Sequence, residues 1–366
     1  MIGAAAARHL AKGGHDVTLI GPGEPDARSN HTGVFASHYD EGRITRLLDP
    51  HPVWEELAAA SLGRYAEIEA ESGIAFYAPV GLLIGAPEGD AYLAKLRAVR
   101  DAAGVACREL TGSAFRQAFP YLNFADDMVM LHQETDAGHI SPRRLVAAQT
   151  RAAKAHGATL VDEIVLSVRG NRVETAEGVQ QFDRVLVACG AFTNAVLERP
   201  LALSPLARTV TLFELDEDEA ARLAAMPSVI FRTPDNSSPY MLPPIRYPDG
   251  KMYLKLGGEP VDVPLAQGAE MQDWFQSTGD PGVGMFHMER MADVMPDLRF
   301  AACHWDSCAV TYTTTALPYI ADLGDGVCVA AGGCGGAAKS SDEIGRLAAQ
   351  TVLGHVDDRF AAQWAD

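Results

Sequence analysis

The residues whose types and spacing most clearly suggest a binding site lie towards the C-terminal end, in the run GGCGGAAKSSDE at 332–343. Four glycines and Ser340-Ser341 follow an apolar strand pattern at 327–330 and precede a helix pattern from about Ser341. Backbone N–H groups at the start of a helix lack partners within that helix, and the helix dipole favours negative charge there. The segment therefore predicts a site for a group that is anionic or becomes anionic. The alternative is a flexible capped turn.

The elements that would position such a group begin at the N-terminus. Residues 3–12 are rich in alanine and predict a helix, and residues 17–20 are a short apolar run typical of a buried parallel strand. This order is the second half of a β-α-β dinucleotide-binding unit, in which Gly3 would be the third glycine of the fingerprint. We expect the first strand and first two glycines to precede Met1, although a plain N-terminal helix packed on a sheet is the alternative. Glu24 is the nearest carboxylate for a ribose.

Other segments predict further elements of this nucleotide-binding unit and then a second domain inserted into it. Residues 145–158 predict an amphipathic helix, and an apolar strand at 185–188 runs into Gly190, where small residues allow close approach of the backbone. Residues 206–300 hold more proline and aromatic residues and several strand patterns, which predict a mostly antiparallel second domain inserted into the first. The run FYAPVGLLIGAP at 76–87 predicts a hairpin.

Composition excludes several classes of function. The chain has 366 residues, enough for about two domains, and a formal net charge of −18. This charge argues against binding to nucleic acid or to an anionic membrane. The sequence has no membrane-spanning apolar run and no signal peptide, and its six cysteines are scattered, so we expect a cytoplasmic protein with reduced thiols. The histidines form no HxH or HExxH spacing, so no metal site is predicted.

Across nearly its whole length the sequence resembles the FAD-dependent oxidoreductases of the D-amino-acid oxidase superfamily, most closely the monomeric sarcosine oxidase and N-methyltryptophan oxidase branch. Each motif is modest alone, and the resemblance rests on their order and spacing. The motifs are AAAARHLAKGGHDVTLIGPGEP, GRITR, GHISPRRLVAAQTRAAKAHGATLV, RVLVACGAFTN, YPDGKMYLKLG, TYTTTALPYI and GGCGGAAKSSDEIGRLAA.

The resemblance implies an α/β fold of two domains. A Rossmann-like, glutathione-reductase-type FAD-binding domain, here lacking its first strand, would comprise 1–80, 135–205 and 301–366. An inserted α+β substrate domain with an antiparallel sheet would comprise 81–134 and 206–300. The resemblance also implies bound FAD, a small amine or amino-acid substrate, and O₂ as electron acceptor. Hydride would pass from the carbon next to nitrogen to flavin N5, the imine would hydrolyse, and O₂ would become H₂O₂.

Individual residues acquire roles from the same resemblance. Lys255 in LKLG stands at the family position of a lysine whose ammonium offsets negative charge as O₂ is reduced. Its alternative is a surface lysine at a strand end. Tyr312 would line the substrate side or pack in the core. The residues expected to contact FAD are Gly3, Glu24, Ser29, Arg43, Val165, Gly190, Gly333, Gly335, Gly336 and Lys339.

Arg46 and Lys339 fall at the family positions that bind a substrate carboxylate. A planar guanidinium suits that task, because it donates two parallel hydrogen bonds to the two oxygens. A salt bridge from Arg46 to Asp40, Glu41 or Asp49 is the alternative, since acidic residues are plentiful nearby.

Two positions depart from the family pattern. Val310 stands where sarcosine oxidases carry the cysteine that binds FAD covalently, and Cys308 lies two residues further back, so we expect FAD to be non-covalent. Glu259 replaces a family histidine, and an anion there would disfavour a carboxylate substrate such as sarcosine, or would suit a cationic amine. Three interpretations compete with an amine oxidase: a flavin dehydrogenase that uses another acceptor, a non-catalytic or nicotinamide-binding domain, and a truncated, inactive chain without cofactor.

Overall fold

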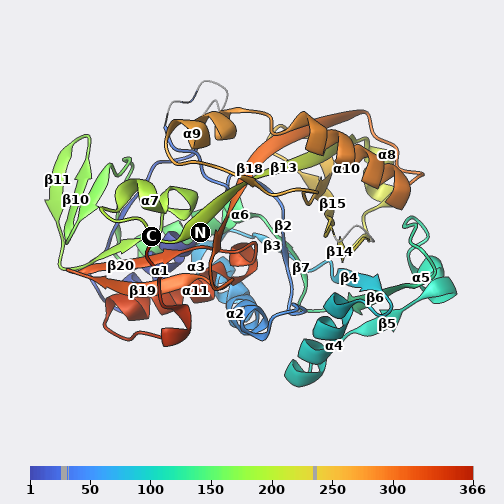
Figure 1. The fold of residues 1–366 in the computed structure, drawn as a ribbon, viewed down its shortest axis with the longest axis horizontal. Coiled ribbons are helices and arrows are strands. Elements are labelled where there is room, and N and C mark those ends of the chain that lie inside the picture. The colour runs from blue at the N-terminus through green and yellow to red at the C-terminus, as the bar shows by residue number, and fades with distance from the viewer. Residues whose placement is uncertain (26–30, 32, 234–236, 366) are drawn as a thin grey trace.

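The computed structural model describes residues 1–25, 31, 33–233 and 237–365 (Figure 1). The chain forms a mixed α/β fold in which parallel strands and their helices adjoin one large sheet. Within the described ranges, no helix combines the length and apolar character needed to cross a membrane.

Five of the eleven α-helices in the described residues begin at a polar side chain that accepts a hydrogen bond from the first turn. Asp90 and Ser141 act in this way, the former through the N–H of Tyr92 and the latter through the N–H of Arg144. The helices are α1 (Ile2–Lys12), α2 (Pro52–Leu62), α3 (Tyr65–Ser72), α4 (Ala91–Ala103), α5 (Gly112–Ala118), α6 (Pro142–Ala155), α7 (Thr193–Val196), α8 (Glu217–Arg222), α9 (Ala269–Gln276), α10 (Pro281–Val294) and α11 (Ala337–Val352), with 3₁₀ turns at Gly190–Phe192 and Asp358–Phe360.

The predicted helices at 3–12 and 145–158 are confirmed as α1 and α6. The expected start of the last helix is wrong, because α11 begins at Ala337 rather than near Ser341. Alanine at 337 and 338 favours helix from the end of the glycine run onwards. Lys339 and the two serines that follow it therefore lie inside the first turns of α11, where they are buried.

Outside the largest sheet, the described residues form parallel pairs in two sheets. β1 (Thr18–Ile20) pairs with β8 (Thr159–Val161), and β12 (Val185–Val187) pairs with β20 (Val327–Ala331), both in parallel. β19 (Tyr319–Gly324) completes the second sheet beside β20. Helix α1 packs against both α6 and α11, so these strands and helices form one layered unit (Figure 1).

Two small antiparallel sheets flank this unit. The first extends outward at the left of Figure 1, and the second lies near the centre. The first contains β9 (Ser167–Arg169), β10 (Arg172–Thr175) and β11 (Gly178–Gln181), and the second contains β2 (Arg43–Thr45), β3 (Tyr77–Ala78) and β7 (Gly138–Ile140).

A buried arginine connects three helices of the unit. The side chain of Arg8 on α1 is completely buried, and its Nε and Nη2 lie 2.6 Å from Glu71 and 2.5 Å from Glu67 on α3. Its Nη1 lies 3.7 Å from Asp342 on α11. Arg64 also reaches Asp342, at 2.5 Å. These charged contacts hold α1, α3 and α11 in a fixed arrangement.

The largest sheet, of nine strands in the described part of the chain, is antiparallel except for one pair, which is β4 with β14. This confirms the mostly antiparallel pattern predicted for 206–300. The strands are β4 (Leu82–Pro87), β5 (Arg108–Leu110), β6 (Met128–Gln133), β13 (Leu203–Leu215), β14 (Ser228–Phe231), β15 (Tyr240–Arg246), β16 (Met252–Gly257), β17 (Val263–Pro264) and β18 (Ala302–Thr313).

The hairpin predicted at 76–87 is wrong. β3 pairs with β7, whereas β4 pairs with β6 and β14 in the large sheet. The two apolar runs are therefore adjacent in sequence but bury their side chains in different sheets. The large sheet also crosses the expected domain boundary at residue 300, since β18 pairs with β13 along almost its whole length (Figure 1).

The two faces of the large sheet have different surroundings. Phe213 and Leu254 belong to an apolar core on one face, and α8 and α10 pack on that side. Residues that lie directly opposite each other in an antiparallel pair share a face. Leu212 lies opposite Lys255, and Arg208 lies opposite Cys308, so the other face carries these charged and polar side chains. The sheet thus positions the candidate site.

Candidate active site

Lys255 lies on β16 in the interior of the protein, with none of its side chain exposed. Its ammonium donates to the carboxylate of Asp40 and, at 3.0 Å, to the carbonyl oxygen of Gly42. Burial, together with the charge of Arg43, lowers the pKa of Lys255 well below its usual value. The alternative of a surface lysine at a strand end is therefore excluded.

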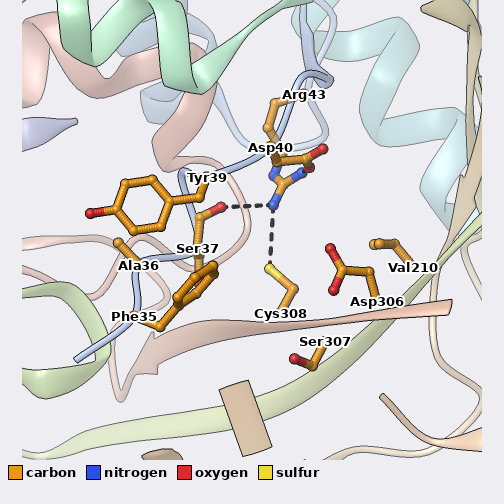
Figure 2. A pocket seen from close by; sticks show the side chains of 10 residues that line it. All are labelled: Phe35, Ala36, Ser37, Tyr39, Asp40, Arg43, Val210, Asp306, Ser307 and Cys308. Carbon is orange, nitrogen blue, oxygen red and sulfur yellow. Dashed lines mark hydrogen bonds and ion pairs between the residues drawn. The ribbon is translucent and has the colours of Figure 1, made fainter. Parts of the chain in front are cut away.

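The carboxylate of Asp40 contacts two cations, of which Figure 2 draws Arg43. It contacts the guanidinium of Arg43 as well as Lys255, and it accepts a hydrogen bond from the Tyr247 hydroxyl at 2.8 Å. Arg43 Nη2 also lies 3.3 Å from the Sγ atom of Cys308, which rises from β18 in Figure 2. The residues drawn there line a small cavity between the sheet face and the segment before β2.

Arg46 and Lys339 meet at one acidic side chain, Asp49. Arg46 Nη2 and Lys339 Nζ lie 3.1 Å and 3.3 Å from the same Asp49 oxygen. The Lys339 ammonium also donates to the Trp54 carbonyl at 2.7 Å. Burial lowers the pKa of Lys339 to about 8, although Asp49 opposes this effect. The structure thus brings the two predicted carboxylate-binding residues together, with the Asp49 carboxylate between them. The salt bridge from Arg46 to Asp49 is one of those named as the alternative for Arg46.

The glycine-rich turn lies beside Tyr312. A Cβ added at Gly335 would stand 3.8 Å from the Tyr312 hydroxyl, and the φ of +78° at Gly335 favours glycine. The N–H of Cys334 donates to the Thr311 carbonyl at 2.9 Å, which ties the turn to β18. The start of α11 therefore faces the same strand that carries Cys308.

Hydrogen bonds within the turn correct one expectation. The Gly333 carbonyl accepts from the N–H groups of Gly336 and Ala337, at 2.8 Å and 3.0 Å. The expectation that N–H groups at this helix start lack partners is therefore wrong for these two. A Cβ at Gly336 would come within 2.6 Å of the Trp54 ring, so this position has no room for a side chain.

Arg208 and Glu259 form an ion pair on the same sheet face. Arg208 Nε lies 3.2 Å from a Glu259 oxygen, and its guanidinium lies 5.9 Å from the centre of the Tyr312 ring. Glu259 also accepts from the N–H of Thr209, and burial raises the pKa of Glu259 to about 7 despite Arg208. Arg208 therefore supplies a counter-charge to the anion expected at this position.

The residues predicted to bind the nucleotide gather near the ends of the short parallel strands. Gly3 lies close to the residue after β12, since a Cβ there would stand 3.3 Å from that of Ala188. Gly190 follows two residues later, and a Cβ there would meet open space. Val165 and Ile20, the last residue of β1, pack against the same apolar cluster, which includes Val187 of β12.

Glu24 has a different partner from the one expected. Its carboxylate accepts from Nε and Nη2 of Arg143, at 2.6 Å and 2.7 Å. Arg143 also contacts Glu41. The ribose role predicted for Glu24 therefore has to compete with this ion pair. Ser29, also predicted to contact FAD, lies outside the described residues.

Asp40 and Arg208 are the site residues that sequence reasoning missed. Asp40 was considered only as a partner of Arg46, because the sequence does not show that Lys255, 215 positions away, reaches it. Arg208 carried a usable signal, since it is a charged residue inside the apolar and threonine-rich strand LSPLARTVTLFEL. Such a residue needs a partner when it is buried, and Glu259 provides one.

Known proteins resemble this chain in sequence and in fold. The sequence model of the DAO family, described as "FAD dependent oxidoreductase", matches residues 1–351. A monomeric sarcosine oxidase from Bacillus sp. (strain B-0618) is 25% identical over an alignment of 244 residues, and the match covers 64% of this chain. The matched region spans 61% of the length of that curated relative.

Solved structures with the same fold include two that cover nearly the whole chain. NikD, described as an unusual amino acid oxidase essential for nikkomycin biosynthesis, has a TM-score of 0.77 at 20% identity, with 100% of this chain and 95% of that chain covered. An L-proline dehydrogenase from P. horikoshii has a TM-score of 0.77 at 16% identity, with 97% and 92% covered. Since the family model spans almost all of the sequence, the chain belongs to the DAO family of FAD-dependent oxidoreductases.

Proposed function

We propose that the protein oxidises a small amine or amino acid, with FAD as cofactor and O₂ as electron acceptor. The substrate loses a hydride from carbon and a proton from nitrogen, and water hydrolyses the resulting imine to a carbonyl compound and an amine. O₂ takes up two electrons and two protons and becomes H₂O₂. The observation that carries the proposal is the buried ammonium of Lys255, on the sheet face that also holds Tyr312.

The chain's residues fit FAD at both ends of the proposed site. At the nucleotide end, Gly3 packs closely on Ala188, and Gly190 faces open space, so the backbone can approach a pyrophosphate. At the sheet, the buried Lys255 and the partly buried Arg43 share one carboxylate, and this surplus of positive charge suits a ring that gains negative charge on reduction.

Bound FAD would supply the hydride acceptor. Arg46 and Lys339 would bind a substrate carboxylate in place of Asp49, which already occupies both cations in the same way. Tyr312, beside Gly335, would line the substrate side. The ammonium of Lys255 would offset negative charge on O₂ as it is reduced, and its lowered pKa would ease release of a proton to the product.

The names of the relatives support a substrate with nitrogen near a carboxylate, since they include a sarcosine oxidase, an amino acid oxidase and a proline dehydrogenase. We also infer that FAD is held without a covalent bond. Val310 offers no nucleophile, and the thiol of Cys308 contacts Arg43.

A flavin dehydrogenase that uses another acceptor is the second candidate, and one contact favours it. Asp40 pairs with Lys255 and so reduces the net positive charge available to O₂. Stoichiometric H₂O₂ during substrate oxidation would support the oxidase. Substrate-dependent bleaching of the flavin without H₂O₂ would support the dehydrogenase.

The proposal is tested by the visible spectrum of the purified protein and by a panel of N-methyl and D-amino acids scored for bleaching. Arg46→Ala should raise KM for carboxylate substrates far more than for plain amines, because the plain amines offer no carboxylate to bind. Equal effects on both groups would remove Arg46 from the carboxylate site. A colourless protein that takes up no added FAD would refute the proposed function.

A further inference from the structure

We propose that Asp40 is a positioning residue that keeps Lys255 protonated and holds its ammonium over the sheet face, and that it thereby sets the pH range in which the protein passes electrons to O₂. This inference rests on the proposed function and deepens it. Asp40 is not assigned any role by the resemblance described above; its role follows from its contacts.

Asp40 is fixed independently of Lys255. Its Oδ1 atom accepts from the Tyr247 hydroxyl at 2.8 Å and from the N–H of Glu41 at 2.7 Å. Its Oδ2 atom is the one that contacts both Lys255 and Arg43. Two donors thus orient one oxygen, and the other oxygen is left to receive the cations. A carboxylate held in this way loses little conformational freedom when it binds an ammonium.

The surroundings of Lys255 contain charges of both signs. Arg43 on β2 disfavours its protonated form, whereas Asp306 on β18 favours it. The thiol of Cys308 and the phenol of Tyr247 lie in the same cluster. The burial of Lys255 itself is the strongest influence, and it favours the neutral amine. The direct contact with Asp40 favours the protonated form of Lys255 and so opposes the effects of burial and of Arg43.

Removal of this carboxylate should therefore shift the titration of Lys255 towards acid. An opposite charge in contact changes the pKa of a partner by about 1–3 units. In Asp40→Asn the rate at which O₂ reoxidises the substrate-reduced protein should start to fall at a pH about 1–3 units lower than in the unchanged protein. At lower pH, where Lys255 is protonated in both proteins, Asp40→Asn should react with O₂ as fast as the unchanged protein or faster, because its ammonium lacks a counter-charge.

The experiment follows reoxidation by rapid mixing from pH 5 to 10 in the flavin-loaded protein, in Asp40→Asn, in Lys255→Met and in the double variant. Asp322→Asn is the matched control, since Asp322 pairs with Arg184 at 3.0 Å on a different sheet. Tyr247→Phe, which removes one donor to Asp40, serves if Asp40→Asn does not fold. It should shift the profile in the same direction by less than one pH unit.

A second readout does not depend on turnover. The difference in unfolding free energy between the unchanged protein and Lys255→Met, measured against pH, reports the titration of Lys255. The same difference, measured in chains that also carry Asp40→Asn, should change at a lower pH. This series tests the pairing of Asp40 with Lys255 even in a preparation that binds no flavin. A failure to bind flavin would refute the proposed function and leave the test of the pairing intact.

The proposal is overturned if the reoxidation profile of Asp40→Asn coincides with that of the unchanged protein. It is also overturned if Asp40→Asn slows Lys255→Met further, because a residue that acts through Lys255 has no effect once the ammonium is gone.

Discussion

Glu259 offers a test of the site that needs neither substrate nor turnover. The variant Glu259→Gln replaces a buried carboxyl with an amide of similar shape, and the amide cannot ionise. Burial raises the pKa of Glu259 from 4.5 to about 7 in the folded protein. Because the folded state holds this proton to higher pH, the stabilisation is present in full below pH 4.5 and is lost as pH rises through about 7.

The size of the effect follows from the same two values. The interval between 4.5 and about 7, at about 1.4 kcal/mol per pH unit, corresponds to about 3 kcal/mol. The side chain of Glu259 is only 8% exposed, so solvent screening is small. The unfolding free energy of the unchanged protein should therefore fall by about 3 kcal/mol relative to Glu259→Gln between pH 4.5 and 8.

Urea unfolding of both proteins at closely spaced pH values measures this difference directly. Glu177→Gln, in the exposed turn between β10 and β11, is the matched control and should show no such change. A difference that stays flat for Glu259→Gln would refute the reasoning. It would mean that Arg208, 3.2 Å away, keeps the carboxylate ionised throughout.

The remaining predictions concern the cofactor, the reaction with O₂ and the helix contacts. Lys255→Met should slow reoxidation by O₂ by about 10²–10³-fold and leave anaerobic reduction by substrate little changed; rapid mixing separates the two, and equal losses would contradict the assigned role. Acid precipitation should release the flavin into the supernatant, and flavin that stays with the pellet would contradict non-covalent binding. Arg8→Met should cost about 1.5–3 kcal/mol of stability in denaturant unfolding, because it removes the charged hydrogen bonds to Glu67 and Glu71, which keep only Lys12, while Asp342 keeps Arg64. Arg184→Met, at an exposed pair, should cost about 1 kcal/mol or less, and equal costs would contradict this account.

The local elements around the site were predictable because their signals are local. The alanine-rich run of α1 and the apolar face of α6 repeat at helical spacing, and the apolar runs of β1, β12 and β20 are too short for helices. Where the local signal was weak, the prediction failed. The glycine run before α11 contains no residue that fixes the first turn, so the predicted start was displaced from Ala337.

The pairing of distant segments was not predictable in the same way. The run at 76–87 has the composition of a hairpin, and only the available edges of β6 and β14 decide that β4 joins the large sheet. Ion pairs are also non-local. Lys255 could be placed on a strand from LKLG, but its contact with Asp40 depends on how the segment before β2 crosses the sheet face. A single sequence carries no record of that crossing.

β18 has a mechanical consequence for how ligands reach the site. It pairs with β13 across the large sheet, and its Thr311 carbonyl receives the N–H of Cys334 from the turn before α11. A hinge that opened the sheet away from the turn would have to bend this strand or break that bond. Exchange of small molecules should therefore proceed through displacement of side chains or short loops, and the separation between sheet and turn should stay nearly constant during turnover.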